Sequence, residues 1–426
     1  MDDGAPTPRV EVENPYKGLR SFDAVDAADY FGRERLVDRL LFRLSEPGTR
    51  GRFVALVGPS GSGKSSAVKA GLRPALARGA LPLSREWFNV EMVPAPHPFE
   101  ELEAALLSVA VDPPSVLLER LTSTSAGLHK ALATVLPDDH SQLLLVIDQF
   151  EELFTQVDDE TADRFLEALV HAVTAENSRL RVVVTLRADF YDRPLRHRAL
   201  GELLREGTEV ITPMSAEEIE RAIMGPAEPQ GVVFEPALVA RLIHDVADRP
   251  SVLPLLQYTL TELFEGRTSS RITTDAYDEL GGVSGALVKR AEGILTGLSS
   301  TGQDAARLVL LRLVTLGEGS EDTRRRVLLG ELEELPLAPS DLGVVLETFA
   351  RHRLLSFDRD PVSRSPSVEI AHETMLTEWG RLRDWIDGRR SGDVHRRHVG
   401  GPRMGHVVNR WERAHDDPRH RRSVLC

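Results

Sequence analysis

The chain has 426 residues, which is too long for one compact core and predicts roughly two to four domains. Its formal net charge is -14, and because a surface that binds nucleic acid is usually basic, we do not expect nucleic acid as the main partner. The single cysteine, Cys426, excludes a disulfide or a multi-cysteine zinc site within one chain. Neither a signal peptide nor a membrane span is recognisable, so we expect a cytoplasmic protein without membrane contact.

The first predicted element is a helix that begins after Gly32. Residues 1–13 are polar and predict a flexible tail. Beyond them, apolar residues at positions 36, 37, 40, 41 and 44 keep helical spacing, which predicts a helix opened by the turn at Gly32 and Arg33.

A P-loop follows the next predicted element, a buried strand at 53–57. In the pattern G-x-x-x-x-G-K-S, the glycines let the backbone wrap so that N–H groups point at phosphate oxygens. Lys64 places a positive charge near the β- and γ-phosphates, and the Ser65 hydroxyl can coordinate Mg²⁺. A plain glycine–serine turn is the weaker interpretation, because strand, motif and following helical pattern coincide. The predicted nucleotide-binding residues here are Gly58, Pro59, Ser60, Gly61, Ser62, Gly63, Lys64, Ser65 and Ser66.

The P-loop also suggests a role for the preceding turn. A Gly-Arg-Glu turn that opens a helix just before a P-loop strand often lies against the nucleotide base. The alternative is a plain helix packed on the sheet, and both interpretations can hold. We therefore count Gly32 and Arg33 as candidate nucleotide-binding residues.

Short apolar runs that alternate with helical patterns predict an α/β fold with a parallel sheet and helices on both faces. The five runs lie at 53–57, 88–93, 143–147, 181–186 and 208–212. One run separates the P-loop strand from the run that ends before Asp148. This order is typical of the P-loop class that has an extra strand between these two in the sheet and that usually adds a catalytic glutamate.

Acidic residues follow the third run. Asp148 stands where a Walker-B aspartate belongs and is predicted to hold Mg²⁺ together with Ser65. Glu151 or Glu152 can polarise the attacking water, although acids in the first turn of a helix also complement its dipole. Of the two, we choose Glu152 as the catalytic residue.

The fourth run ends beside Asp148 in the predicted sheet. Thr185 and Arg187, at its carboxyl end, can therefore reach the γ-phosphate, where an arginine reads a terminal phosphate through charge-assisted hydrogen bonds. The alternative for Arg187 is a surface ion pair with Asp189 or Asp192.

Helices dominate the rest of the chain. Ser215 and Glu218 have the spacing of a capping box, and a leucine stripe follows Pro250. Further on, helices bracket two extended pieces at 354–357 and 368–370, which predicts a winged helix. The predicted domains are a flexible tail 1–13, a P-loop NTPase domain 14–214, a helical lid 215–300, a winged-helix domain 301–388 and a basic tail 389–426.

Several motifs together give the chain a family resemblance. It resembles the STAND class of signal-transducing P-loop ATPases, and within it the novel STAND NTPase group of bacterial multidomain proteins. The P-loop alone is shared by many families, whereas the whole set in this order is specific and covers residues 14 to about 388. The motifs are N-P-Y-K-G-L at 14–19, F-G-R-E at 31–34, the P-loop, D-Q-F-E-E-L-F at 148–154, T-L-R-A-D-F at 185–190, L-P-L-L-Q-Y at 253–258 and A-H-E at 371–373.

The resemblance implies an ATPase core, a lid and a winged helix that clamp ATP or ADP. It implies that Pro254 packs on adenine and that His372 touches the β-phosphate of ADP, although a histidine at a helix start can equally be a structural cap. Relatives often carry WD-type propeller repeats or an effector domain. Neither is recognisable here, so we expect either separate partners or a truncated copy.

We therefore predict an ATP-binding signal-transduction switch with slow, Mg²⁺-dependent hydrolysis. ADP would hold a closed form and ATP an open one that self-associates and meets protein partners. Two other functions remain open: a mechanical AAA-type ATPase with fast turnover, and a nucleotide-stabilised scaffold that does not hydrolyse.

Overall fold

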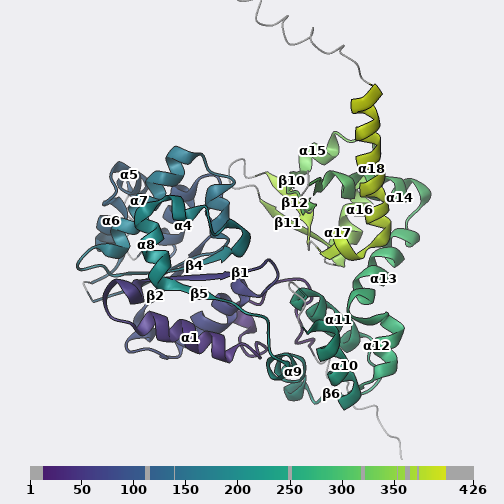
Figure 1. Ribbon diagram of the computed structural model, residues 1–426, viewed down its shortest axis with the longest axis horizontal. Helices are drawn as coiled ribbons and strands as arrows, with labels where there is room; N and C mark the ends of the chain where they lie inside the picture. Colours follow the sequence, from purple (N-terminus) through teal and green to yellow (C-terminus); the bar gives the residue numbers. More distant parts are fainter. Residues whose placement is uncertain are drawn as a thin grey trace, which may run out of the picture.

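A five-stranded parallel sheet is the core of the N-terminal half of the computed structural model (Figure 1). Its strand order is β2-β3-β4-β1-β5, so β4 lies between the P-loop strand and the strand before Asp148, as predicted. The strands are β1 (Phe53–Gly58), β2 (Phe88–Met92), β3 (Leu143–Ile147), β4 (Leu180–Arg187) and β5 (Thr208–Val210). The structure describes residues 13–110, 116–138, 140–247, 252–317, 322–352, 354–359, 365–371 and 374–399.

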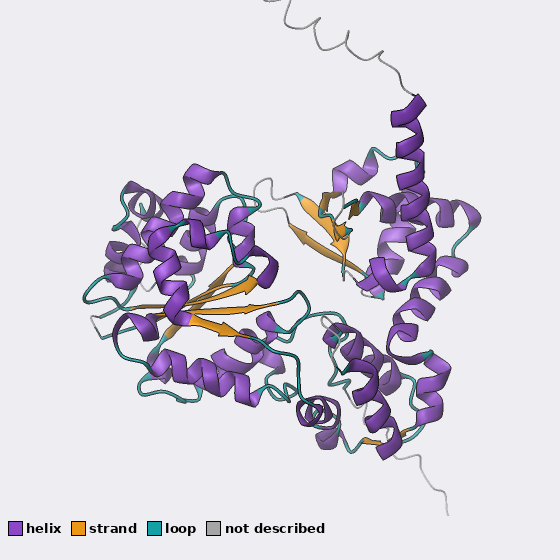
Figure 2. Cartoon of the chain, viewed as in Figure 1, coloured by secondary structure: helices purple, strands orange, loops and turns teal. Residues whose placement is uncertain are grey.

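The strands β1 and β3 are buried along their whole length and carry no polar side chain, because both faces of the sheet are covered there. Along β1, Phe53, Ala55 and Val57 belong to one hydrophobic cluster, whereas Val54 and Leu56 belong to another on the opposite face. Figure 2 shows helices on both sides of the sheet. The helices of this half are α1 (Glu34–Ser45), α2 (Lys64–Ser66) continued by η3 (Ala67–Leu72) and α3 (Arg73–Ala77), α4 (Pro98–Leu107), α5 (Leu117–Ser123), α6 (Gly127–Val135), α7 (Asp159–Thr174) and α8 (Arg198–Gly207).

A group of helices follows the sheet, and its first helix starts at the predicted capping box. Ser215 Oγ accepts a hydrogen bond from the Glu218 backbone N at 3.2 Å, and Glu218 Oε2 accepts one from the Ser215 backbone N at 2.9 Å. One two-residue ladder interrupts the helices. The elements are α9 (Ala216–Met224), β6 (Val233–Phe234), α10 (Pro236–Val246), α11 (Leu253–Glu265), β7 (Arg271–Ile272), α12 (Thr274–Leu280) and α13 (Gly282–Gly297).

The last part has the element order of a winged helix. A helix, a strand, two helices and two strands succeed one another as α14, β10, α15, α16, β11 and β12, and the three strands form an antiparallel sheet of order β10-β12-β11. The bounds are α14 (Ser300–Arg312), β8 (Val314–Thr315), β9 (Thr323–Arg324), β10 (Val327–Leu328), α15 (Leu329–Glu333), α16 (Pro339–Arg351), β11 (Leu355–Arg359), β12 (Pro366–Ile370), α17 (Thr374–Glu378) and α18 (Gly380–Val399).

The fold predicted from the sequence is confirmed, whereas the domain boundaries stay predictions. The helix α18 continues to Val399, so the first part of the predicted basic tail is helical. Among the residues that the structure describes, no helix combines the length and the apolar character needed to cross a membrane.

One hydrophobic cluster runs through the helical part and the winged helix, and Tyr16 from the N-terminus belongs to it. The Tyr16 ring makes edge-to-face contacts with Phe234 and Phe264, with ring centroids 6.4 and 5.9 Å apart. Its hydroxyl donates a hydrogen bond to the carbonyl O of Ile223. The segment around Tyr16 is therefore anchored on the helices that follow the sheet.

We expect Tyr16→Phe to lower the free energy of unfolding by about 1–3 kcal/mol, because the buried Ile223 carbonyl loses its donor. Tyr16→Ala should cost about 3–5 kcal/mol, since a cavity is added. Urea unfolding followed by circular dichroism measures both. Val25→Ala is the control, because Val25 is 88% exposed and should change stability by less than about 0.5 kcal/mol. A Tyr16→Ala variant as stable as the control would contradict this anchoring.

Candidate nucleotide-binding site

A cavity of about 490 Å³ lies at the carboxyl ends of β1, β3 and β4. Its walls come from the sheet domain, from α11 and from the winged helix, so three parts of the chain meet there. Most of the predicted site residues line it. They are Arg33, Ser60, Gly61, Gly63, Lys64, Ser65, Ser66, Asp148, Glu151, Thr185, Arg187 and Pro254.

Six predicted residues do not line the cavity in the described structure. His372 lies outside the described residues. The other five, all described, stand behind the wall or beside it, and three of them belong to the P-loop itself. These five are Gly32, Gly58, Pro59, Ser62 and Glu152.

The P-loop is a tight turn held by its own lysine. Gly61 and Gly63 have φ values of +69° and +89°, which glycine adopts at no steric cost. Lys64 Nζ donates hydrogen bonds to the carbonyl O atoms of Gly58 at 3.0 Å and Pro59 at 2.8 Å. Burial lowers the pKa of Lys64, while the charge of Glu151 opposes that shift. A buried ammonium therefore faces the cavity beside backbone amides, as an anion site requires.

The Asp148 carboxylate receives three donors from different elements. Ser65 Oγ and Thr185 Oγ1 donate to Asp148 Oδ1 at 2.8 and 2.6 Å, and Lys69 Nζ lies 3.1 Å from Oδ2. Because the Ser65 hydroxyl donates its hydrogen bond to Asp148, the lone pairs of its oxygen remain available to a metal. This oxygen donor set fits Mg²⁺, which prefers oxygen ligands from few side chains together with phosphates.

Lys69 belongs to a charged cluster that sequence reasoning missed. Its Nζ also lies 2.5 Å from Glu91 Oε1, and Arg73 Nη1 lies 2.7 Å from Glu91 Oε2. Glu91 is in β2, next to the strand that precedes Asp148. Helical spacing could have indicated this cluster from the sequence. Lys69 and Arg73 stand four and eight residues after Ser65, which places the three side chains on one face of the P-loop helix.

Glu151 and Glu152 are both buried but face different partners. Glu151 lines the cavity, and its Oε2 accepts a hydrogen bond from the Arg187 backbone N at 3.2 Å. Burial raises the pKa of Glu151. Burial also raises the pKa of Glu152 to about 7, and the charges acting on it include Arg326 and Glu369 of the winged helix. Which of the two is catalytic stays a prediction.

Thr185 and Arg187 lie at the end of β4, as the sheet order requires. Thr185 Oγ1 accepts a hydrogen bond from the Gln149 backbone N at 2.9 Å, so it orients the turn after Asp148. The Arg187 side chain lines the cavity and pairs with Asp189, with contacts of 3.1 and 2.8 Å. The ion pair considered from the sequence is therefore present alongside the cavity position.

The turn before α1 is hydrogen-bonded to the P-loop through Arg33. Arg33 is buried and donates from Nη1 to the Thr212 carbonyl O at 3.0 Å and from Nη2 to the Ser62 carbonyl O at 3.2 Å. Gly32 has a φ of +85°, and a Cβ there would lie 2.2 Å from the Glu218 carbonyl O. This turn thus packs on the P-loop and on α9 at once.

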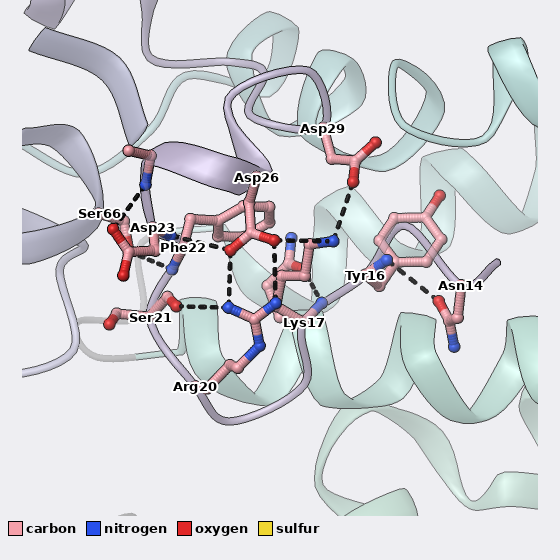
Figure 3. Close-up of polar contacts among 12 residues, drawn as sticks. Asn14, Tyr16, Lys17, Arg20, Ser21, Phe22, Asp23, Asp26, Asp29 and Ser66 are labelled. Carbon is pink, nitrogen blue, oxygen red and sulfur yellow. Dashed lines mark hydrogen bonds and ion pairs between the residues drawn. The ribbon is translucent and has the colours of Figure 1, made fainter. Parts of the chain in front are cut away.

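The N-terminal segment lines a further part of the cavity with residues 18–22 and 29–31. Figure 3 shows the polar contacts within this segment and to Ser66. The folded shape of the segment depends on Asp26, which accepts two hydrogen bonds from Arg20 at 2.6 and 2.9 Å and lies 3.1 Å from Lys17 Nζ. Burial raises the pKa of Asp26, but the bonds from Arg20 and Lys17 outweigh it and lower that pKa overall. The Phe22 backbone N donates to Ser66 Oγ at 3.1 Å, which joins this segment to the P-loop helix.

Comparison with known families agrees with this geometry. A model of the family described as novel STAND NTPase 1 matches residues 15–419. The chain belongs to this family. It is thus a P-loop NTPase, and the family resemblance inferred from the sequence is confirmed. No curated protein matches the chain.

Solved structures similar to this STAND NTPase include the Aeropyrum pernix ORC1 protein in complex with DNA, at 16% identity and a TM-score of 0.45, covering 86% of this chain and 94% of the other. The Aeropyrum pernix ORC2 protein, in ADPNP–ADP complexes, has 16% identity and a TM-score of 0.45, covering 92% and 97%. A Walker-type ATPase of Pyrococcus abyssi has 13% identity and a TM-score of 0.43, covering 85% and 98%. These values are too low to transfer DNA binding or nucleotide binding from those proteins to this chain.

The raised pKa of Glu152 predicts a pH-dependent stability. The pKa rises from 4.5 to about 7 on folding, so Glu152 favours the folded state below about pH 4.5 and loses that contribution as the pH rises through 7. Glu152→Gln should therefore be close to the wild type in stability at about pH 4 and exceed it at about pH 8 by at most about 3 kcal/mol. Urea unfolding at both pH values measures this, and an equal difference at the two would contradict burial of the charged carboxylate as its cause.

Proposed function

We propose that this STAND NTPase is an ATP-binding switch that hydrolyses ATP slowly with Mg²⁺. An ADP-bound form would be closed, and an ATP-bound form would open, self-associate and engage protein partners. One observation carries the proposal: Lys64 of the P-loop, Pro254 of α11 and Arg324 of the winged helix line the same cavity. A nucleotide bound there contacts three parts of the chain, so its affinity depends on how they are arranged.

Within this proposal five polar residues that line the cavity have separate roles. Lys64 and the P-loop amides bind phosphates, and Ser65 and Asp148 hold Mg²⁺, which would neutralise phosphate charge when bound. Thr185 orients Asp148 through its hydroxyl. Glu151 is the better supported of the two glutamates as the residue that holds the attacking water, because it lines the cavity and its charge acts on Lys64.

The test is to identify the nucleotide that copurifies with the protein and to measure turnover and mass. We expect bound ADP in a monomer, slow hydrolysis, and a larger mass by light scattering with ATP. Lys64→Ala should lose tight binding of both nucleotides, because the phosphates lose their buried positive charge. Lys130→Ala, on the exposed face of α6, is the matched control and should bind as the wild type does.

Other outcomes separate the alternative functions. Fast turnover without a nucleotide-dependent change of mass would favour a mechanical ATPase. Tight binding without measurable hydrolysis, with or without added Mg²⁺, would favour a scaffold. Nucleotide affinity that Lys64→Ala leaves unchanged would contradict the binding site itself.

The two glutamates can be separated by single substitutions. Glu151→Gln should keep ATP binding and lower the hydrolysis rate by about 100-fold or more, because an amide cannot take a proton from water. Glu152→Gln should lower it less, since Glu152 does not line the cavity. Single-turnover hydrolysis and calorimetric ATP affinity measure both effects. If Glu152→Gln instead lowers the hydrolysis rate more than Glu151→Gln does, Glu152 is the catalytic residue, as predicted from the sequence.

A further inference from the structure

Three consecutive arginines of the winged-helix domain, Arg324 to Arg326, serve different neighbours. Arg324, the last residue of β9, donates from Nη1 to the carbonyl O atoms of Ile370 at 3.2 Å and Ala371 at 3.1 Å. The next arginine, Arg325, pairs with Glu331 of α15, with Nη1 at 3.0 Å from Oε1. Neighbours of equal charge therefore occupy different environments.

Only the first of these three arginines lines the cavity that the P-loop forms. Figure 1 shows why this is possible, because the sheet of β10, β11 and β12 lies on the side of the winged helix that faces the five-stranded sheet. Arg324 shares its wall with Ser356, Glu369 and Ala371, and Lys64 lies in the wall from the sheet domain. The arginine thus faces a space whose other wall is built for phosphates.

The winged-helix wall carries charges of both signs. Its acid, Glu369, lies with Oε1 3.9 Å from Arg324 Nη1 and 3.7 Å from Arg326 Nη2. Arg324 and Arg326 therefore lie near the same carboxylate, but of the two only Arg324 lines the cavity. The charge of Arg326 also acts on Glu152, so Arg326 has a second acidic neighbour. Arg324 is thus the guanidinium of this pair that can attract an anion in the cavity.

Arg324 is also held in place before any ligand binds. The two carbonyl groups engage Nη1 alone, whereas a guanidinium has five N–H donors in a rigid plane. A side chain fixed in this way loses little freedom when an anion binds, which favours affinity.

We propose that Arg324 is a phosphate-binding residue that the winged-helix domain contributes to the nucleotide site, an inference that rests on the proposed function. Its ligand is a nucleoside di- or triphosphate held at the other end by Lys64. Because Arg324 belongs to the winged helix and Lys64 to the sheet domain, the bound phosphates join the two. The contact is made only while the winged helix lies against the cavity, so it biases the closed form.

The experiment compares Arg324→Met with Arg325→Met in the full chain. Calorimetry gives the dissociation constants for ATP and ADP. Arg324→Met should weaken at least one nucleotide by about 10- to 100-fold, the range expected for loss of a hydrogen bond to a charged group. Arg325→Met, which removes the same charge one residue away, should stay within about twofold of the wild type. Equal affinities for the two variants would overturn the inference.

Two further measurements keep the result decisive. If Arg324→Met melts well below Arg325→Met by circular dichroism, Arg324→Gln replaces it, because Gln keeps a donor for the carbonyls and removes the charge; the same weakening is expected. Lys64→Ala separates failure of this inference from failure of the proposed function. If nucleotide binding depends on Lys64 but not on Arg324, the role of Arg324 is rejected and the proposed function stands. If the wild type binds neither nucleotide, both are rejected.

Discussion

The Asp148 carboxylate is the constraint on which the rest of the site depends. A buried carboxylate is costly unless it is fully partnered, and here Ser65, Thr185 and Lys69 supply the partners. Those donors stand on the P-loop helix and on β4, so the carboxylate fixes the P-loop relative to two strands. The sheet order β3-β4-β1 makes these contacts possible, because it places the ends of these strands within reach of one another.

The N-terminal segment extends that constraint to the lid. At one end of the segment, Tyr16 is packed among the helices that follow the sheet. At the other end, the Phe22 backbone N donates a hydrogen bond to Ser66, which follows Ser65 in the P-loop helix. Between these anchors, the buried Asp26 carboxylate holds the segment in one shape through its ion pairs with Lys17 and with the half-exposed Arg20. One short segment of chain, held by ion pairs, therefore connects the helices around Tyr16 to the P-loop helix, and its last link is the hydrogen bond from Phe22 to Ser66. A displacement of those helices would be passed to the P-loop helix through this segment.

The fold could be predicted from the sequence where an element is determined by residues close together in the chain. Parallel strands buried on both faces read as apolar runs, and the P-loop and the capping box at Ser215 are short motifs with fixed backbone requirements. The charged cluster around Asp148 was harder to predict, because Lys69 and Glu91 are far apart in the sequence and look like ordinary surface charges there. Arg324 was missed for the same reason. Glu151 and Glu152 are adjacent on one short turn, and only tertiary contacts distinguish their surroundings: the end of β4 for Glu151 and the winged helix for Glu152.

Charged residues of the winged helix act both on the cavity and on Glu152. This double role explains how the proposed switch could work. Glu369 lies beside Arg324 in the cavity wall and also among the charges that act on Glu152. Moving the winged helix away would expose Glu152 to water and remove Arg324 from the cavity in the same step. A ligand shifts a two-state equilibrium only by its differential affinity for the two states. In the proposed switch, groups that belong to the P-loop would bind phosphate in both states, so the bias would have to come from groups that leave on opening. Arg324 would be a charged group of that kind among the residues that the structure describes.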